Sequence, residues 1–542
     1  MGVSIIVFGR CGLFLSMFKK ISYTVFASFY PPQAGAFDST TPYQLMTSTK
    51  RPAVTGSTRP VATLTAGLML ATFFGFCITP LWDIDFWWHA ATGRAILEAG
   101  EIPDTDPLGI YQVKDLRAEV LLRAYWLSQV LYQFLLEGFG TSGIIVLRAI
   151  VLTSALGLMM WRAHRLGAGA FWTGLITVLA GCTALAFSGD RPALFSFLGI
   201  AILMPLVDRV RKKPDCPAAL GLISLMIVWA NLHGGVTLGG VLLVMIALCI
   251  PLEQRLRGGR PMAKDRLVVA ILIAGALATL LSPNGLDLYR MVWEYQGSEM
   301  QNRTSEYLSP LAAWQRLGIA IPGYWVLLLL SLATLVRLAQ QRQLVALAVT
   351  AFLLIISANA FRYVPFFLFG AAPETARALQ ELTPRSETWH RVRGAANIGL
   401  LLGACALLAW GATTGRAFRV GLKEGRYPVE AVAFLQQSGL QGRIFNHFNW
   451  GGYLSYHAGP GITPFIDGRN LEFEVFGKYT HILWVTELGR RLLDQEGFRL
   501  VITPDFQPLT GEHYPINDYL DRQPAWKRIH RDEVAQVFQR IP

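Results

Sequence analysis

The sequence predicts a polytopic α-helical membrane protein of about eleven transmembrane helices, followed by a C-terminal α/β domain. The 542 residues are 53% hydrophobic and only 15% charged, whereas a soluble chain of this size carries roughly 25% charged residues. The apolar residues occur in blocks of about 15 to 21 residues, and most blocks are long enough, or nearly so, to cross a hydrocarbon core of about 30 Å. After residue 425 the composition becomes more polar, and strand-like and helix-like segments alternate.

The predicted transmembrane domain covers residues 61–415. Before it lies a cytoplasmic tail over 1–60, whose second half is rich in Ser, Thr, Pro and Gln and is therefore expected to be disordered. A start at Met46 instead of Met1 is an open alternative. Hydrophobic length predicts spans at 61–81, 143–162, 168–187, 192–208, 217–231, 235–252, 266–282, 318–338, 343–360, 361–377 and 395–414.

The basic residues predict the orientation of these spans. If the apolar block 124–139 does not cross, the loops on the side of the N-terminal tail hold seventeen Lys and Arg residues, whereas the short opposite turns hold only Arg191 and Arg362. This is the positive-inside pattern. We therefore expect 124–139 to lie on the outer membrane surface, within a first outer loop over 82–142. The formal net charge of +12 has the same topological origin and does not indicate nucleic-acid binding.

Residues 426–542 are expected to form the extracytoplasmic α/β domain. A helix should end at Gly439, and an amphipathic helix should cover 479–497. Strands are predicted over 442–448, 462–469 and 498–504, with a closing hairpin over 526–540.

Two carboxylates stand directly after the first predicted span, in the stretch WDIDFWWH over 82–89. Asp83 and Asp85 share a face only in an extended chain, because two residues turn a helix by about 200°. Carboxylates at a membrane boundary are costly unless they are functional or hydrated. They are therefore either a hydrated helix end beside an interfacial aromatic belt or part of a functional site. A helix expected over 86–99 follows and ends at Gly100, and a second acidic pair, Asp104 and Asp106, comes after it.

The order of these motifs resembles the GT-C superfamily of polytopic glycosyltransferases, which includes the protein mannosyltransferases and the lipid A aminoarabinose transferases. The closest resemblance is to a bacterial branch of that superfamily, and it covers about residues 61–542. It is carried in the first outer loop by Asp83, Asp85, His89, Ile102-Pro103, Asp106-Pro107 and the stretch 126–131. Further matches are Arg191-Pro192, the stretch 229–235, Pro283-Asn284-Gly285, the stretch 450–454 and Asp467-Gly468-Arg469.

The resemblance implies an enzyme of the bacterial inner membrane that transfers a sugar from a polyprenyl-phosphate-linked donor to an extracytoplasmic acceptor, usually with inversion. The acceptor would be a glycan, a lipid or a protein. Asp85 or Asp83 would be the base that takes the proton of the acceptor hydroxyl. The same two residues would hold Mg²⁺ or Mn²⁺ if the enzyme uses a metal, as some GT-C enzymes do.

Further candidates stand at the turns that the charge pattern places on the same outer face. Candidates for binding the donor phosphate and sugar are Arg191, Arg362, His233, Asn231 and His89, and secondary acidic candidates are Asp104, Asp106 and Glu306. Each has a structural alternative: the arginines reach lipid headgroups, His233 is a satisfied core histidine, and Asp467 pairs with Arg469.

Two other classes of function stay open at this point, namely a transporter or flippase, and a membrane scaffold whose C-terminal domain binds a partner. A transporter should show repeated halves and charges deep inside its spans. No repeat is visible, and Arg148 is the one charge well inside a predicted span.

Overall fold

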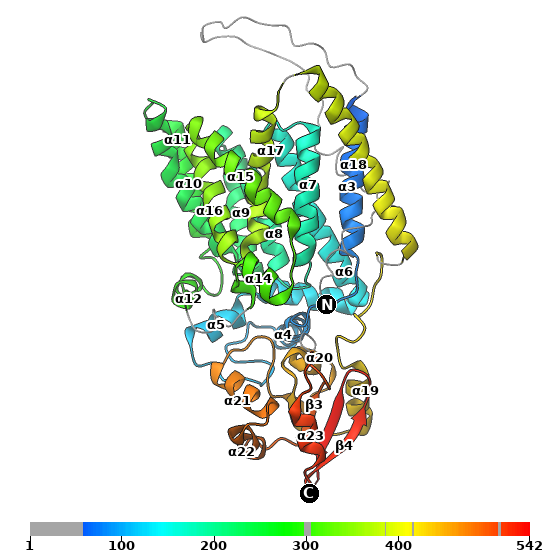
Figure 1. The fold of residues 1–542 in the computed structure, drawn as a ribbon. Helices are drawn as coiled ribbons and strands as arrows, with labels where there is room; N and C mark the ends of the chain where they lie inside the picture. Colours follow the sequence, from blue (N-terminus) through cyan, green and yellow to red (C-terminus); the bar gives the residue numbers. More distant parts are fainter. Residues whose placement is uncertain (1–57, 298–304, 385, 415–416, 508–510, 542) are drawn as a thin grey trace, which may run out of the picture.

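The computed structural model of the chain describes residues 58–297, 305–384, 386–414, 417–507 and 511–541. The predicted N-terminal tail lies outside the described residues as far as residue 57, and the first helix begins at Thr58. Figure 1 shows a bundle of long helices with a smaller part at one end that contains a β-sheet. Helices α4 (Phe86–Ala99) and α5 (Leu116–Arg123) lie between these two parts.

Every predicted span overlaps a helix of the bundle. These helices are α3 (Thr58–Cys77), α6 (Trp126–Arg165), α7 (Ala170–Ala184), α8 (Ala193–Lys212), α9 (Cys216–Leu232), α10 (Val236–Leu256), α11 (Ala263–Ala278), α15 (Pro322–Gln340), α16 (Leu344–Asn359), α17 (Val364–Leu382) and α18 (Glu387–Thr414). Among the described residues, five helices are long and apolar enough to cross a membrane, namely α6, α7 with the 3-10 turn η1 (Leu185–Phe187), α8, α10 and α15. Three shorter apolar helices lie in α3, α9 and α16. The chain is an integral membrane protein, while the number of eleven crossings stays a prediction.

Helix α6 is bent at Gly140, whose backbone angles of φ 60° and ψ −160° are not helical. Glycine reaches such angles without the steric cost that a Cβ atom brings. The bend separates the block 124–139, for which we predict a surface position, from the following span. The segment before the bend packs against α4, and the indole N–H of Trp126 donates to Asn231 Oδ1 at 2.9 Å.

The first outer loop contains the predicted helix, α4, which ends at Gly100 as expected. Gly100 takes the left-handed conformation at φ 73°, and its N–H donates to Ile96 O at 2.8 Å. Short elements complete this end of the bundle. They are α12 (Asp287–Tyr295), η2 (Ser305–Tyr307), α14 (Pro310–Leu317) and η3 (Phe361–Tyr363).

The C-terminal part contains a five-stranded mixed sheet of order β2-β1-β3-β5-β4. The strands are β1 (Gly442–Asn446), β2 (Ile462–Pro464), β3 (Leu500–Thr503), β4 (Trp526–Arg531) and β5 (Gln536–Arg540). Strand β1 runs parallel to both β2 and β3, and β5 runs antiparallel to β3 and β4. The three predicted strands and the closing hairpin are therefore confirmed.

The helices of this part are α19 (Val429–Ser438), α20 (Gly451–His457), α21 (Phe473–Leu483), α22 (Glu487–Gln495) and α23 (Pro515–Asp521). Helix α19 ends at Gly439 as predicted. The single amphipathic helix predicted over 479–497 is wrong, because Val485 takes a positive φ of 52° and breaks it. Thr486 then begins α22 as its N-cap, where its side chain accepts a hydrogen bond from the Gly489 N–H.

A fully buried ion pair joins α6 to the turn before α8. Arg148 Nη1 lies 2.8 Å from Asp190 Oδ2, and both side chains are completely buried. The same guanidinium donates to the carbonyl oxygens of Cys77, the last residue of α3, and of Thr79 just after it. Arg148, the charge predicted inside a span, thus has a carboxylate partner and ties three segments together.

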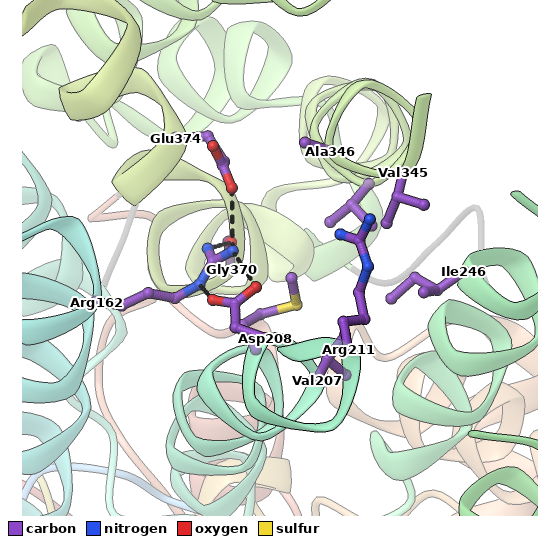
Figure 2. Close-up of a pocket in the computed structure, with 11 residues that line it drawn as sticks. Arg162, Val207, Asp208, Arg211, Ile246, Val345, Ala346, Gly370 and Glu374 are labelled. Atoms are coloured by element: carbon purple, nitrogen blue, oxygen red, sulfur yellow. Dashed lines mark hydrogen bonds and ion pairs between the residues drawn. The ribbon is translucent and has the colours of Figure 1, made fainter. Parts of the chain in front are cut away.

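A second ion cluster joins α6, α8 and α17 farther from the C-terminal part. Figure 2 shows Arg162 between Asp208 and Glu374, with Nε 2.6 Å from Asp208 Oδ2 and Nη2 3.1 Å from Glu374 Oε1. The adjoining cavity of about 20 Å³ has room for about one water molecule. This cluster therefore ties helices together and has no space for a substrate.

The Arg148–Asp190 pair gives a stability prediction. Arg148→Met leaves the Asp190 carboxylate buried without a counter-charge, which costs about 3–5 kcal/mol in comparable cases. We expect a clearly lower unfolding temperature in detergent, and partial recovery in the double variant Arg148→Met/Asp190→Leu. The control is Arg290→Met, because Arg290 is 65% exposed in its pair with Asp287. Equal unfolding temperatures for Arg148→Met and the control would contradict the prediction.

Candidate functional site

Arg191 binds three carboxylates at the end of the bundle that faces the C-terminal part. Its Nε lies 2.8 Å from Asp83 Oδ2, and its Nη1 lies 3.1 Å from Asp85 Oδ2 and 2.5 Å from Glu306 Oε1. These residues come from the segment between α3 and α4, the turn before α8, and η2. The fold therefore gathers four predicted site residues in one place, although they lie up to 223 positions apart in sequence.

Local sequence explains how the turn before α8 reaches the acids. A Cβ atom at Gly189 would collide with Asp83 Oδ2, so only glycine lets this backbone approach so closely. In the same turn, the buried Arg148–Asp190 pair fixes the residue directly before Arg191. The two residues before Arg191 are thus held in place, and they position Arg191 in front of the acidic pair.

The two aspartates have different surroundings. Asp83 is 1% exposed in its side chain, and its Oδ1 accepts the backbone N–H of Asp85 at 3.1 Å. Asp85 directly precedes α4 and is 18% exposed in its side chain, and its Oδ1 accepts the Trp88 indole N–H at 3.3 Å. Of the two, Asp85 is the carboxyl group that an incoming molecule can reach.

The surroundings of Asp85 raise the pKa of its carboxyl group toward neutral pH. Burial raises the pKa of Asp85 to about 7, Arg191 opposes this effect, and the charges of Asp83 and Glu306 add to it. Arg191 holds the pKa of Glu306 below its usual value, against the effect of burial, with a further contribution from Arg362. Asp85 thus exchanges a proton near pH 7, while Glu306 stays ionised.

Arg362 is the second cation of the site. Its guanidinium lies over the Tyr307 ring at 4.6 Å, and its Nη1 is 4.0 Å from Glu306 Oε2. Among the described residues, neither this guanidinium nor Arg191 Nη2 has a hydrogen-bond acceptor within normal distance. Both arginine side chains are 34% exposed, so they present free N–H donors.

His233, in the turn between α9 and α10, has a defined tautomer. Its Nδ1 accepts the Gly235 N–H at 2.9 Å and lies 2.6 Å from Ser196 Oγ, which itself accepts the Trp229 indole N–H at 2.8 Å. The hydroxyl of Ser196 therefore donates to Nδ1, and the ring proton is on Nε2. Burial, with the charge of Arg362, lowers the pKa of His233 to about 3. The ring is neutral and offers one N–H.

Four predicted site residues lie outside this cluster. His89 is buried, with Nδ1 3.4 Å from Gln129 Nε2. Asn231 accepts from Trp126 and donates to Leu281 O at 2.9 Å. Asp104 forms an exposed ion pair with Arg123. Asp106 accepts three backbone N–H groups and binds Arg469. In all four cases the structure shows side chains that tie neighbouring segments together.

The C-terminal part forms one wall of the site. Asp467, Asp106 and Arg469 form the buried ion cluster that fixes it to the first outer loop, so that the predicted Asp467–Arg469 pair is present at 2.7 Å. Between them, the backbone of Gly468 lies against Asp85, and a Cβ atom there would overlap Asp85 Oδ1. Tyr427 also donates to the Asp83 carbonyl at 2.9 Å. The C-terminal part therefore contacts the candidate base directly.

The supporting residues of the site are not predicted by the sequence patterns. Asp190, Gly189 and Ser196 each act through a contact with a distant segment, which no local pattern reveals. A signal for Asp190 was nevertheless present, because it is a carboxylate at the end of a predicted span.

The carboxylates do not fit a divalent cation in this arrangement. Asp83, Asp85 and Glu306 each direct one oxygen at Arg191, which takes the central position that a shared metal ion would need. Within the described ranges, no group of three or more His, Cys, Asp or Glu residues is arranged to hold a metal ion.

Comparison with known proteins relates this architecture to solved structures. No protein-family model and no curated protein sequence matches the chain. A crystal structure of the Archaeoglobus fulgidus oligosaccharyltransferase with zinc and sulfate matches with a TM-score of 0.55 at 10% identity, over 82% of this chain and 68% of that chain. The same archaeal enzyme, AglB, with an inhibitory peptide and a dolichol-phosphate matches with a TM-score of 0.55 at 11% identity, over 82% and 69% of the two chains.

A third structure, ArnT from Cupriavidus metallidurans bound to undecaprenyl phosphate, covers 90% of this chain and 98% of that chain, with a TM-score of 0.49 at 12% identity. At identities this low, the two oligosaccharyltransferase matches show the fold alone. The chain shares the fold of these archaeal structures, which agrees with the fold that the motif resemblance predicts.

Proposed function

We propose that the chain is a membrane glycosyltransferase that moves a sugar from a polyprenyl-phosphate-linked donor to a hydroxyl group of a glycan, lipid or protein acceptor. The observation that carries the proposal is the composition of one site. Asp85, whose pKa is raised to about 7, lies in the same ion cluster as two arginines that have N–H donors without an acceptor among the described residues. A general base and a phosphate-binding pair are the two requirements of this reaction.

Asp85 is the base in this proposal, because Asp83 is completely enclosed. The acceptor hydroxyl gives its proton to Asp85, and its oxygen forms the new bond to the anomeric carbon of the sugar. The bond between that carbon and the phosphate oxygen breaks at the same time, and polyprenyl phosphate leaves with the electron pair. Direct displacement inverts the anomeric configuration.

The free donors stabilise the leaving phosphate. Arg191 Nη2, the Arg362 guanidinium and the Nε2–H of His233 belong to one electrostatic cluster, in which Arg362 and Arg191 both act on the pKa of His233. Guanidinium groups bind phosphate oxygens through paired, charge-assisted hydrogen bonds. These donors gain strength as charge develops on the phosphate oxygen in the transition state.

An apolar groove supports a lipid-linked donor. A cavity of about 590 Å³ lies between α10, α11 and α12, lined among others by Leu248, Leu277, Leu286 and Tyr289. Helix α10 begins directly after the His233 turn, and Tyr289 packs against Gly240 on that helix. The groove suits an isoprenoid chain whose phosphate reaches the arginines. AglB has been solved with a dolichol-phosphate.

We place the chain in a bacterial inner membrane, with this site and the C-terminal domain on the extracytoplasmic side. The support is the asymmetry of the loops, with seventeen basic residues opposite the site and only Arg191 and Arg362 at the short turns beside it. Both of these arginines are engaged in the cluster.

Substitution of the aspartates tests the reaction. In nanodiscs with polyprenyl-phosphate sugars, Asp85→Asn is expected to lower the release of polyprenyl phosphate by about 10²–10⁴-fold, the usual contribution of a general base. Asp83→Asn should also lower it, because Asp83 orients Arg191. The matched control is Glu98→Gln, an exposed acid on α4. Binding of several donors without turnover, unchanged in either aspartate variant, would instead favour a transporter or a scaffold.

The raised pKa of Asp85 predicts the pH dependence. Only the ionised carboxylate accepts a proton, so kcat/KM is expected to rise about tenfold per pH unit below pH 7 and to level off above it. Glu306→Gln removes a negative charge that raises the pKa of Asp85. In this variant the rise of kcat/KM with pH should therefore level off at a lower pH than in the wild type. If kcat/KM of the wild type levelled off near pH 4, this result would exclude Asp85 in this environment as the base.

Gly468 tests the contribution of the C-terminal part. A methyl group in Gly468→Ala would overlap the Asp85 carboxylate, and the displaced base should lower turnover by about 100-fold. Gly477→Ala is the control, since a Cβ atom at Gly477 meets open space. Full activity of Gly468→Ala at an unchanged unfolding temperature would show that this contact does not position the base.

A further inference from the structure

We propose that the guanidinium group of Arg191 takes the place of a divalent cation, so that the site binds its phosphate without a metal ion. The claim that the site binds a phosphate rests on the proposed function. The claim that Arg191 replaces a divalent cation rests on the geometry of three carboxylates and can be tested without any substrate.

The three carboxylates surround one guanidinium group, with Asp83 at its Nε and Asp85 and Glu306 at its Nη1. Asp83, Asp85 and Glu306 each contribute one oxygen, at 2.8, 3.1 and 2.5 Å from the nitrogen atoms of a single guanidinium. A hard cation such as Mg²⁺ or Mn²⁺ binds carboxylate oxygens at roughly 2.0–2.2 Å. The centre of this triad holds Nε and Nη1 of Arg191, so a shared metal ion and this guanidinium exclude one another.

The other oxygens of the triad are also directed at nitrogen atoms. Asp83 Oδ1 accepts the Asp85 backbone N–H, and Asp85 Oδ1 accepts the Trp88 indole N–H. Glu306 Oε2 faces Arg362 at 4.0 Å. Each carboxylate therefore has its second oxygen turned away from the centre, where a metal ion would be bound.

Arg191 cannot leave this position easily. The residue before it, Asp190, is completely buried in its pair with Arg148, and Gly189 packs directly against Asp83. The backbone of the turn is thus fixed, and about two thirds of the surface of the Arg191 side chain is covered, since the side chain is 34% exposed. The guanidinium is a permanent part of the site, whereas a bound metal ion would exchange with solvent.

A guanidinium group in place of a metal ion changes the chemistry of phosphate binding. A metal ion would bring two charges and coordinate a phosphate oxygen directly, whereas Arg191 brings one charge and directional N–H donors. Arg362 supplies the second positive charge on the other side of Glu306. The pair of arginines thereby matches the charge of a divalent cation.

Manganese binding by the full-length chain in nanodiscs tests this inference, with electron paramagnetic resonance as the readout for bound Mn²⁺. The wild type is expected to show no stoichiometric Mn²⁺ binding. Arg191→Ala frees the three carboxylates, and this variant should bind one Mn²⁺ at least about tenfold more tightly than the wild type, because affinity follows the number of free charged ligands. The double variant Arg191→Ala/Glu306→Gln should lose most of this gain.

Two results would overturn the inference. One is tight binding of Mn²⁺ by the wild type that Glu306→Gln abolishes. The other is a folded Arg191→Ala variant that binds Mn²⁺ no better than the wild type. Arg191→Gln serves as a second variant if Arg191→Ala does not fold, and the same gain in Mn²⁺ binding is expected of it. Because no sugar donor is used, failure of the proposed function would leave these results unchanged.

Discussion

The contact of one guanidinium with three carboxylates organises this end of the molecule. Arg191 joins the segment after α3, the turn before α8 and the short helix η2, which are remote in sequence. Without a counter-charge, three acids this close together would repel one another at a membrane boundary, where charge is poorly solvated. Their mutual arrangement depends on Arg191, and the position of Arg191 depends in turn on the buried Arg148–Asp190 pair behind it.

The C-terminal part completes the site and is not simply attached to the membrane domain. It is fixed to the first outer loop through Arg469, Asp106 and Asp467, and its Gly468 backbone lies against Asp85. This contact contributes to the burial that raises the pKa of the Asp85 carboxyl. The protonation state of the candidate base therefore depends on how the sheet domain is docked.

Sequence patterns predicted those features that depend on local chemistry. Apolar blocks located the helices, glycines located the ends of α4 and α19, and the acidic motif located Asp83 and Asp85. Charge asymmetry placed Arg191 and Arg362 at the same end of the bundle as the acids, and both are in the cluster.

The remaining features depend on contacts between distant segments. The sequence could not show that Asp106 would bind Arg469, that Asn231 would tie down Trp126, or that Glu306 would meet Arg191. The amphipathic pattern also did not show the break at Val485, where a positive φ and the Thr486 cap separate two helices.

The position of the bound lipid phosphate is the central feature of the proposed mechanism. A cryo-electron microscopy map of the full-length chain in nanodiscs with a long-chain polyprenyl phosphate would show this directly. The account predicts phosphate density in contact with Arg191 Nη2, Arg362 and His233 Nε2, with the isoprenoid chain in the groove between α10, α11 and α12. Phosphate density at the opposite end of the bundle, beside Arg162 and Arg211, would contradict the account.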